Sequence, residues 1–140
     1  MPTSPPTSLP VSQPQAIPPI LVVDCSAIAA FLFDEPEGEA IRAALDGASL
    51  AGPTLLPVEL AHVCLKKMRR TPDAAARLMT AYRTRTLLGI TLHEVDHDAV
   101  PALAVGHGLS AYDACYLWLA RHLNAPLLTL DARLATAAQS

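Results

Sequence analysis

Four acidic residues of this chain lie where a predicted strand ends or where a predicted helix begins. Asp24 follows the apolar run ILVV, and Asp131 follows PLLTL. Ligands of open parallel sheets gather outside the carboxyl ends of the strands, so we expect both side chains at one edge. Glu59 and Asp113 each lie in the first turn of a predicted helix, and helices that follow parallel strands begin at the same edge. The sequence therefore predicts that these four carboxylates converge.

Clustered carboxylates point to divalent-metal chemistry. Neighbouring negative charges repel one another and raise each other's pKa unless a cation neutralises them. Oxygen ligands without a nearby cluster of Cys or His suit Mg²⁺, with Mn²⁺ as the alternative. The four acids therefore favour a magnesium or manganese site at this edge of the sheet.

Each acid also has a purely structural interpretation. Asp113 follows Ser110 by three residues, as in a capping box, and Glu59 is placed to interact favourably with a helix dipole. Asp24 and Asp131 at strand ends are less often structural, because surface loops more commonly carry such residues. The joint placement of all four favours the functional interpretation.

Strands and helices alternate along the chain. Apolar, β-branched ILVVD is typical of a strand buried in a parallel sheet, and GITLHEV and PLLTLD are further strand-like segments. We predict helices at residues 26–33, 37–45, 57–70, 71–85, 98–106, 110–124 and 132–139, with Thr71 and Ser110 as caps. This order predicts an α/β domain with a parallel sheet.

Length and composition indicate one domain of 140 residues. Residues 1–19 contain seven of the 13 prolines and are expected to form a disordered tail, so that the folded domain spans 20–140. No apolar run reaches the roughly 18 residues of a membrane span, and no secretory signal is visible, so we expect a cytoplasmic protein. The three cysteines suit buried free thiols.

The basic residues are unevenly distributed. The net charge is −3, yet seven of the ten basic residues fall between positions 66 and 85. They are either the solvated faces of two helices or a cationic rim for phosphates. The candidates for contact with nucleic-acid phosphates are Lys66, Lys67, Arg69, Arg70, Arg83 and Arg85. The five histidines show no metal-binding spacing, and Tyr112, Tyr116 and Trp118 are expected in the core or at a dimer interface.

Three segments together resemble the VapC-type toxins of the PIN-domain ribonucleases. They are VVDCSAIAAFLFDEPE, LLPVELAHVCLKK and GLSAYDACYLWLARHLNAPLLTLDARL, which follow the family order over residues 20 to 138. The resemblance implies a three-layer α/β/α PIN-like domain with a short parallel sheet of about four to five strands.

The resemblance also implies roles for individual residues. Asp24 matches the aspartate that closes the first strand, with Ser26 as the hydroxyl that orients it, and Glu59 matches the helical glutamate. Asp113 in SAYDA and Asp131, behind Thr129, match the remaining two acids. The departures are mild: Cys25 replaces a more usual alanine, and His62 stands where asparagine is common.

The family likeness implies an endoribonuclease toxin in which the acids hold one or two Mg²⁺ ions that activate water for attack on a phosphodiester. Such a mechanism agrees with metal chemistry and needs no Ser, Cys or His nucleophile. The likeness also implies a cognate antitoxin and a homodimeric state. Two alternatives remain within the fold: a PIN-like protein-binding module without catalysis, and a stand-alone nuclease with no antitoxin. Receiver-like and phosphatase interpretations are weaker, because no lysine follows the last strand and position 26 is Ser where a dehalogenase-type phosphatase needs Asp.

Overall fold

The computed structural model describes residues 17–140. The tail predicted for residues 1–19 lies outside this range except for its last three residues. These three are exposed and form no regular element, although the Pro19 carbonyl accepts a hydrogen bond from the Ser49 amide at 2.8 Å.

The sheet has four parallel strands in the order β3-β2-β1-β4. The strands are β1 (Ile20–Val23), β2 (Ser49–Pro53), β3 (Thr91–His93) and β4 (Leu127–Leu128). In the centre, Val22 of β1 pairs with Ala51 on one side and Leu127 on the other. Val22 and Val23 have no exposed surface, as the apolar run predicted. All four carboxyl ends therefore meet at one edge.

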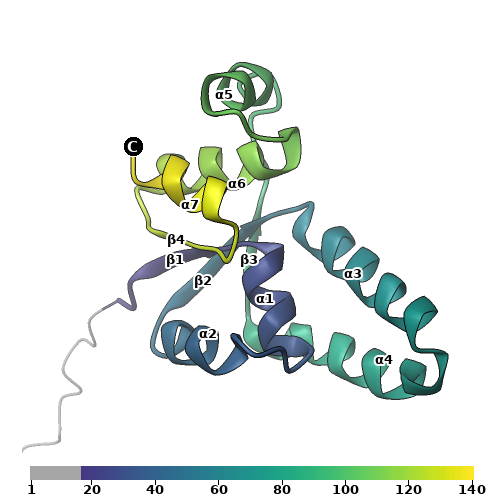
Figure 1. The fold of residues 1–140 in the computed structure, drawn as a ribbon. Coiled ribbons are helices and arrows are strands. Elements are labelled where there is room, and N and C mark those ends of the chain that lie inside the picture. Colours follow the sequence, from purple (N-terminus) through teal and green to yellow (C-terminus); the bar gives the residue numbers. More distant parts are fainter. Residues whose placement is uncertain (1–16) are drawn as a thin grey trace, which may run out of the picture.

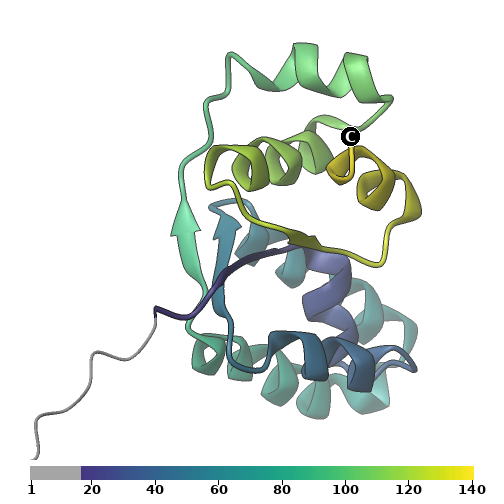
Figure 2. The ribbon, with the colours of Figure 1, turned by 90° about the vertical axis from the view of Figure 1, so that its left-hand side faces the viewer.

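Helices cover both faces of this sheet. They are α1 (Cys25–Leu32), α2 (Gly38–Leu45), α3 (Leu56–Arg70), α4 (Ala75–Arg83), α5 (Val100–His107), α6 (Ala111–His122) and α7 (Ala132–Ala138). Figures 1 and 2 show α1 to α4 on one side, and α6 and α7 on the other with α5 above them. The predicted three-layer α/β/α architecture is confirmed.

The segment predicted as one helix at 71–85 is divided into three. Short 3₁₀ turns, η1 (Pro72–Ala74) and η2 (Thr84–Leu88), flank α4. Thr71 has an extended φ of −134° and makes no side-chain cap bond, so its predicted capping role is wrong. The physical reason is that α4 begins only at Ala75, after the 3₁₀ turn η1, so Thr71 does not precede the first turn of that helix.

Two predicted strands are shorter than the segments that suggested them. GITLHEV contributes only Thr91–His93, and PLLTLD only Leu127–Leu128. Pro126 has no amide hydrogen for a ladder, although its carbonyl accepts from the Val22 amide at 3.0 Å. The residues after Leu128 turn away from the sheet to begin α7, which carries Asp131 off the strand and onto the helix.

A close approach between β2 and α3 determines where α3 begins. A Cβ atom at Gly52 would lie 2.8 Å from Cδ2 of Leu56, the first residue of α3. Leu56 and Leu60 are almost fully buried in the core that β1 and α6 share. The absence of a side chain at position 52 therefore lets the first turn of α3 pack directly against the sheet.

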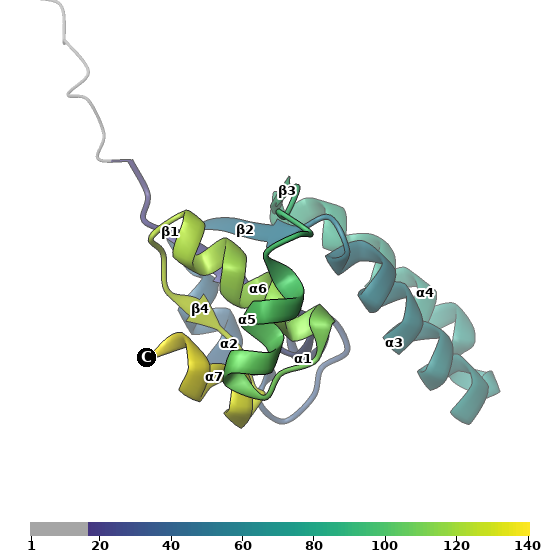
Figure 3. The same cartoon turned by 90° about the horizontal axis from the view of Figure 1, so that it is seen from above.

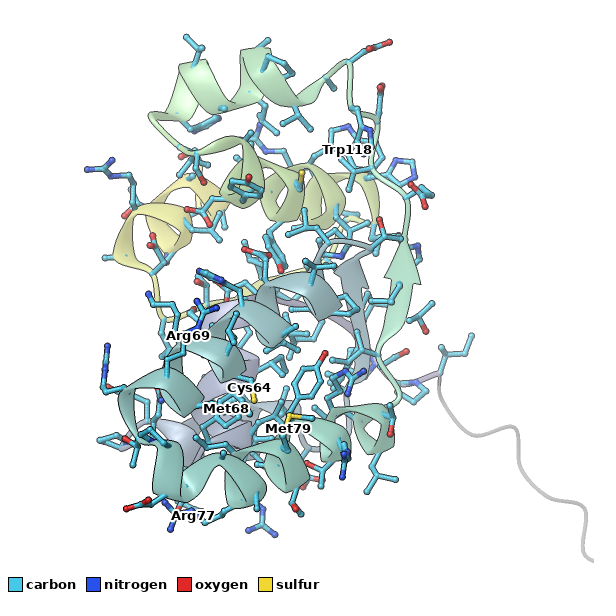
Figure 4. The ribbon with its side chains drawn as sticks, turned by 90° about the vertical axis from the view of Figure 1, so that its right-hand side faces the viewer. Cys64, Met68, Arg69, Arg77, Met79 and Trp118 are labelled. Carbon is cyan, nitrogen blue, oxygen red and sulfur yellow. The ribbon has the colours of Figure 1, made fainter. Side chains whose placement is uncertain are left out.

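Helices α3 and α4 form an arm beside the rest of the domain (Figure 3). Figure 4 shows Cys64, Met68 and Met79 in this arm, and the Cys64 Sγ lies 3.8 Å from the Met68 Sδ. Flexible thioethers fill irregular space between helices well. All three cysteines are free, as expected, but Cys25 is only half-buried. Within residues 17–140, no helix is long and apolar enough to cross a bilayer.

Candidate active site

The four predicted acids all lie at helix N-termini. Asp24 is the N-cap of α1, and Asp131 is the N-cap of α7. Glu59 lies in the first turn of α3, and Asp113 lies in the first turn of α6. The positive end of a helix dipole stabilises a nearby carboxylate. The fold thus supports negative charge at each position, and the structural interpretation of these acids coexists with a functional one.

Asp24 is the most enclosed of the four acids, with 4% of its surface exposed. Its Oδ1 accepts hydrogen bonds from the Ser26 hydroxyl at 2.7 Å and from the Ala27 amide at 3.0 Å. The Thr129 hydroxyl, which comes from the segment after β4, donates to its Oδ2. Both hydroxyls predicted to support the site therefore contact Asp24.

The same hydroxyls join the start of α1 to the loop before α7. Ser26 Oγ accepts from the Leu130 amide at 3.0 Å, and Thr129 Oγ1 accepts from the Asp131 amide at 3.0 Å. The Asp131 carboxylate in turn accepts from the Leu134 amide at 2.8 Å. Asp24 and Asp131 are therefore held by one continuous hydrogen-bond network across the sheet edge.

Glu59 is held from the opposite face of the sheet. The Tyr116 hydroxyl, on α6, donates to Glu59 Oε1 at 2.6 Å. Burial first, and then the adjacent carboxylate, raise the pKa of Tyr116 far above its usual value, so the phenol remains protonated as the donor. This bond connects the helix layers on the two sides of the sheet.

Asp113 lies in the first turn of α6, three residues after the N-cap Ser110. Ser110 Oγ accepts from the Asp113 amide at 3.0 Å, which forms the N-cap half of the capping box that the sequence suggested. The stripe that continues through Leu117 and Ala120 is buried, whereas Asp113 itself is half-buried. The backbone amide of Asp113 therefore takes part in capping the helix, while its half-buried carboxylate remains accessible at the sheet edge.

The acids act on one another electrostatically. Burial raises the pKa of Asp24, of Glu59 and of Asp113, and in each case neighbouring acids raise it further. Asp131 acts on both Asp24 and Asp113, while Glu59 is affected by Asp113 and Asp24. Hydrogen bonds have the opposite effect: the bond from Thr129 lowers the pKa of Asp24, and the bond from Tyr116 lowers the pKa of Glu59. The four carboxylates thus share one region of negative potential.

The four acids offer the ligand type and the negative charge that a divalent cation requires. In the part of the chain that the structure describes, the one ion pair joins Lys67 to Glu35, so no basic side chain neutralises the four acids. The same residues contain no group of three or more candidate ligands already spaced to hold an ion. Carboxylate oxygens suit Mg²⁺ or Mn²⁺, and binding would require the acids to draw closer together.

The thiol nearest these acids is not a competing nucleophile. Burial, followed by the charges of Glu59 and Asp24, raises the pKa of Cys25 to about 12. A thiol must ionise to act as a strong nucleophile. Cys25 therefore stays protonated at neutral pH.

The basic residues predicted for RNA contact lie on the α3–α4 arm and in η2. Lys67 forms a 2.9 Å ion pair with Glu35, and the Arg85 guanidinium lies over the Tyr82 ring. The other four predicted residues are exposed: Lys66, Arg69, Arg70 and Arg83. Figure 4 shows Arg69 on the margin of the arm that faces α7, and Arg77 on the outer margin.

Tyr116 is the site neighbour that sequence reasoning missed. We expected it in the core or at a dimer interface, and it does lie in the core, with 1% of its surface exposed. Its position three residues after Asp113 places it one turn further along the same face of α6. That spacing was the available signal, but its partner lies 57 residues away in the sequence.

Comparisons with known proteins agree with this geometry. The PIN domain family model matches residues 21–139. The chain is similar to Ribonuclease VapC3 of Pyrobaculum aerophilum, with 38% identity over 82% of this chain and 92% of the relative. It is also similar to Ribonuclease VapC9 of Mycobacterium tuberculosis, with 32% identity over 86% and 93%.

A solved structure supports the fold independently. The crystal structure of PAE2754 from Pyrobaculum aerophilum matches with a TM-score of 0.70 at 24% identity, over 86% of this chain and 87% of that one. The family model and the curated relatives each cover most of the described domain. The chain therefore belongs to the PIN-domain family, in its VapC-type branch.

Proposed function

We propose that this protein is a metal-dependent endoribonuclease that acts as the toxin of a toxin–antitoxin pair. The observation that carries the proposal is the meeting of Asp24, Glu59, Asp113 and Asp131 at one sheet edge, without a basic partner among residues 17–140. Two curated relatives are named ribonucleases, which supports RNA as the substrate.

In the proposed mechanism, the four acids together hold one or two Mg²⁺ ions, or Mn²⁺. When bound, such an ion supplies activated water near neutral pH and stabilises charge on the leaving oxygen. Ser26 and Thr129 fix the Asp24 carboxylate, and the Leu134 amide fixes that of Asp131. These bonds hold the charges in place before substrate arrives, which lowers the reorganisation needed during reaction.

Basic residues of the α3–α4 arm are proposed to contact RNA phosphates. Arg69 is the strongest candidate, because it is exposed and lies on the margin that faces α7 (Figure 4). It follows Glu59 by ten residues on one helix, which corresponds to about 15 Å along the axis. Lys67 is the weakest candidate, since Glu35 already pairs with it.

The proposed partners follow from the VapC-type branch. We expect a cognate antitoxin that covers the acidic edge, a homodimeric state, and a cytoplasmic location where RNA is accessible. A partner gene beside this one, encoding a small DNA-binding protein, would support the toxin role, whereas a nuclease without such a neighbour would act alone.

The decisive experiment is cleavage of mixed total RNA by the purified full chain with Mg²⁺, with EDTA and with Asp113→Asn. We expect cutting in Mg²⁺ only, and a loss of at least about 100-fold in the variant, as for removal of a principal charge from such a site. Asp46→Asn, at an exposed carboxylate beyond α2, is the matched control and should cut normally. Metal-dependent cutting that survives Asp113→Asn would refute the site.

If no RNA is cut under any condition, expression in growing cells separates the remaining cases. Growth arrest that Asp113→Asn abolishes would identify a nuclease with a narrow RNA target. Absence of arrest would favour the protein-binding module without catalysis.

A further inference from the structure

Tyr116 makes a contact that a simple core residue does not need. Its ring lies in the main hydrophobic core, and 1% of its surface is exposed. Its hydroxyl points out of that core and donates to Glu59 Oε1 at 2.6 Å. The two residues come from α6 and α3, on opposite sides of the sheet.

This contact restricts a flexible side chain. A free glutamate has several rotatable bonds, and ordering it costs conformational entropy. The Tyr116 ring is packed among core residues, so its hydroxyl is a fixed point to which Glu59 is tied. The bond occupies Oε1, whereas Oε2 accepts no hydrogen bond from a side chain or amide of residues 17–140 and is available to a ligand.

The chemical type of the donor is also informative. A Lys or Arg in place of Tyr116 would hold Glu59 equally well but would cancel its charge. A neutral phenol orients the carboxylate and preserves the negative potential that attracts a cation. Ser26 and Thr129 hold Asp24 in the same way, with neutral hydroxyls.

We propose that Tyr116 is a positioning residue of the acid site, whose hydroxyl holds Glu59 so that its second oxygen can bind a divalent cation. This inference rests on the proposed metal-dependent function. Tyr116 acts only through Glu59 and contacts neither metal nor RNA.

The test is Mn²⁺ affinity of Tyr116→Phe, measured by electron paramagnetic resonance of free Mn²⁺ during titration of the full chain. We expect binding weaker by about 10-fold, since partners that orient metal ligands typically contribute 10- to 100-fold. The Mn²⁺ concentration for half-maximal RNA cleavage should rise by a similar factor. At saturating Mn²⁺ the cleavage rate should return to near the wild-type value.

Two controls separate positioning from a general effect on the fold. Tyr82→Phe removes the same hydroxyl from α4, outside the site, and should leave Mn²⁺ affinity unchanged. In a Glu59→Ala background, Tyr116→Phe should produce no further loss of Mn²⁺ affinity. An equal loss in that background would show that Tyr116 acts through the fold, and would overturn the proposal.

The outcomes distinguish this inference from the proposed function. If the wild-type chain binds no Mn²⁺ and cuts no RNA, the proposed function fails and this inference fails with it. If the wild-type chain binds Mn²⁺ and cuts RNA, but Tyr116→Phe matches it in affinity and metal dependence, only the role of Tyr116 is refuted.

Discussion

Asp24, Glu59 and Asp113 are held in an environment that opposes their ionisation. Burial and mutual repulsion raise the pKa of each, while hydroxyl donors and helix N-termini partly compensate. Ionising these clustered acids lowers the stability of the folded chain, and it also creates a negative potential that attracts cations. Acids with perturbed pKa values of this kind are common at functional sites.

This balance predicts a pH-dependent effect of Asp113→Asn in EDTA. The pKa of Asp113 is higher in the folded chain than in the unfolded chain, so the folded state binds more protons between the two values. Wild-type stability is therefore lost as pH rises through that window, whereas Asn cannot ionise. We expect equal unfolding free energies near pH 4 and a more stable variant at pH 7, measured by urea denaturation.

The control for this prediction is Asp46→Asn, which removes an exposed carboxylate outside the acid site. Mg²⁺ at saturating concentration should stabilise the wild type more than the Asp113→Asn variant, because the ion binds the folded state and loses a ligand in the variant. A difference between Asp113→Asn and wild type that does not change between pH 4 and pH 7 would contradict the electrostatic clustering.

At the scale of elements, the N-termini of helices position the four acids. Three of the acids lie at the start of helices that follow β1, β2 and β4, and because these strands are parallel, the three helix N-termini lie at the same edge of the sheet. The fourth, Asp113, depends on the start of α6, which Ser110 caps. Capping and site assembly are therefore linked through the same residues.

Ser110→Ala is predicted to lower the unfolding free energy by about 1 kcal/mol, the usual contribution of an N-cap hydroxyl. Its Oγ is the acceptor for the Asp113 amide, which would otherwise lose its partner. Urea denaturation in EDTA measures the change. Thr71→Ala is the matched control and should be close to neutral, because Thr71 makes no cap bond. Equal effects of the two substitutions would argue against a specific capping contribution.

At the scale of the whole molecule, charge is separated in space. The chain carries a net charge of −3, while seven of its ten basic residues lie between positions 66 and 85. The structure places this stretch in the α3–α4 arm and η2, and α3 begins at the sheet edge that carries the acids. A polyanion that lay across this edge and along α3 would meet both the acids and basic residues of the arm.

The two margins of the arm allow a matched test of RNA contact. Arg69→Gln in an Asp113→Asn background should weaken binding of RNA and reduce the salt slope of log K by about 1, as expected for one lost phosphate contact. Arg77→Gln, on the outer margin, removes the same charge and should change binding less (Figure 4). Filter binding between 50 and 200 mM salt measures both, a range over which phosphate contacts are sensitive. Equal effects would indicate only long-range attraction.

Much of this fold can be predicted from the sequence, because local sequence patterns determine where its helices and strands form. The apolar run before Asp24, the cap at Ser110 and the alternation of elements predicted the parallel sheet and the helix starts that carry the acids. These features depend on residues within a few positions of one another. The same local reasoning failed at Thr71, because the helix that it was expected to cap begins only at Ala75, and it overestimated the lengths of β3 and β4.

Only the tertiary structure determined how the acids are held. The contacts of Thr129 with Asp24 and of Tyr116 with Glu59 join residues 105 and 57 positions apart. Such pairings depend on strand order and on which helix faces pack together, and no periodicity in a single sequence records them. The sequence by itself thus determined which residues could do the chemistry, and the packing of α3 and α6 across the sheet decided which neighbours orient them.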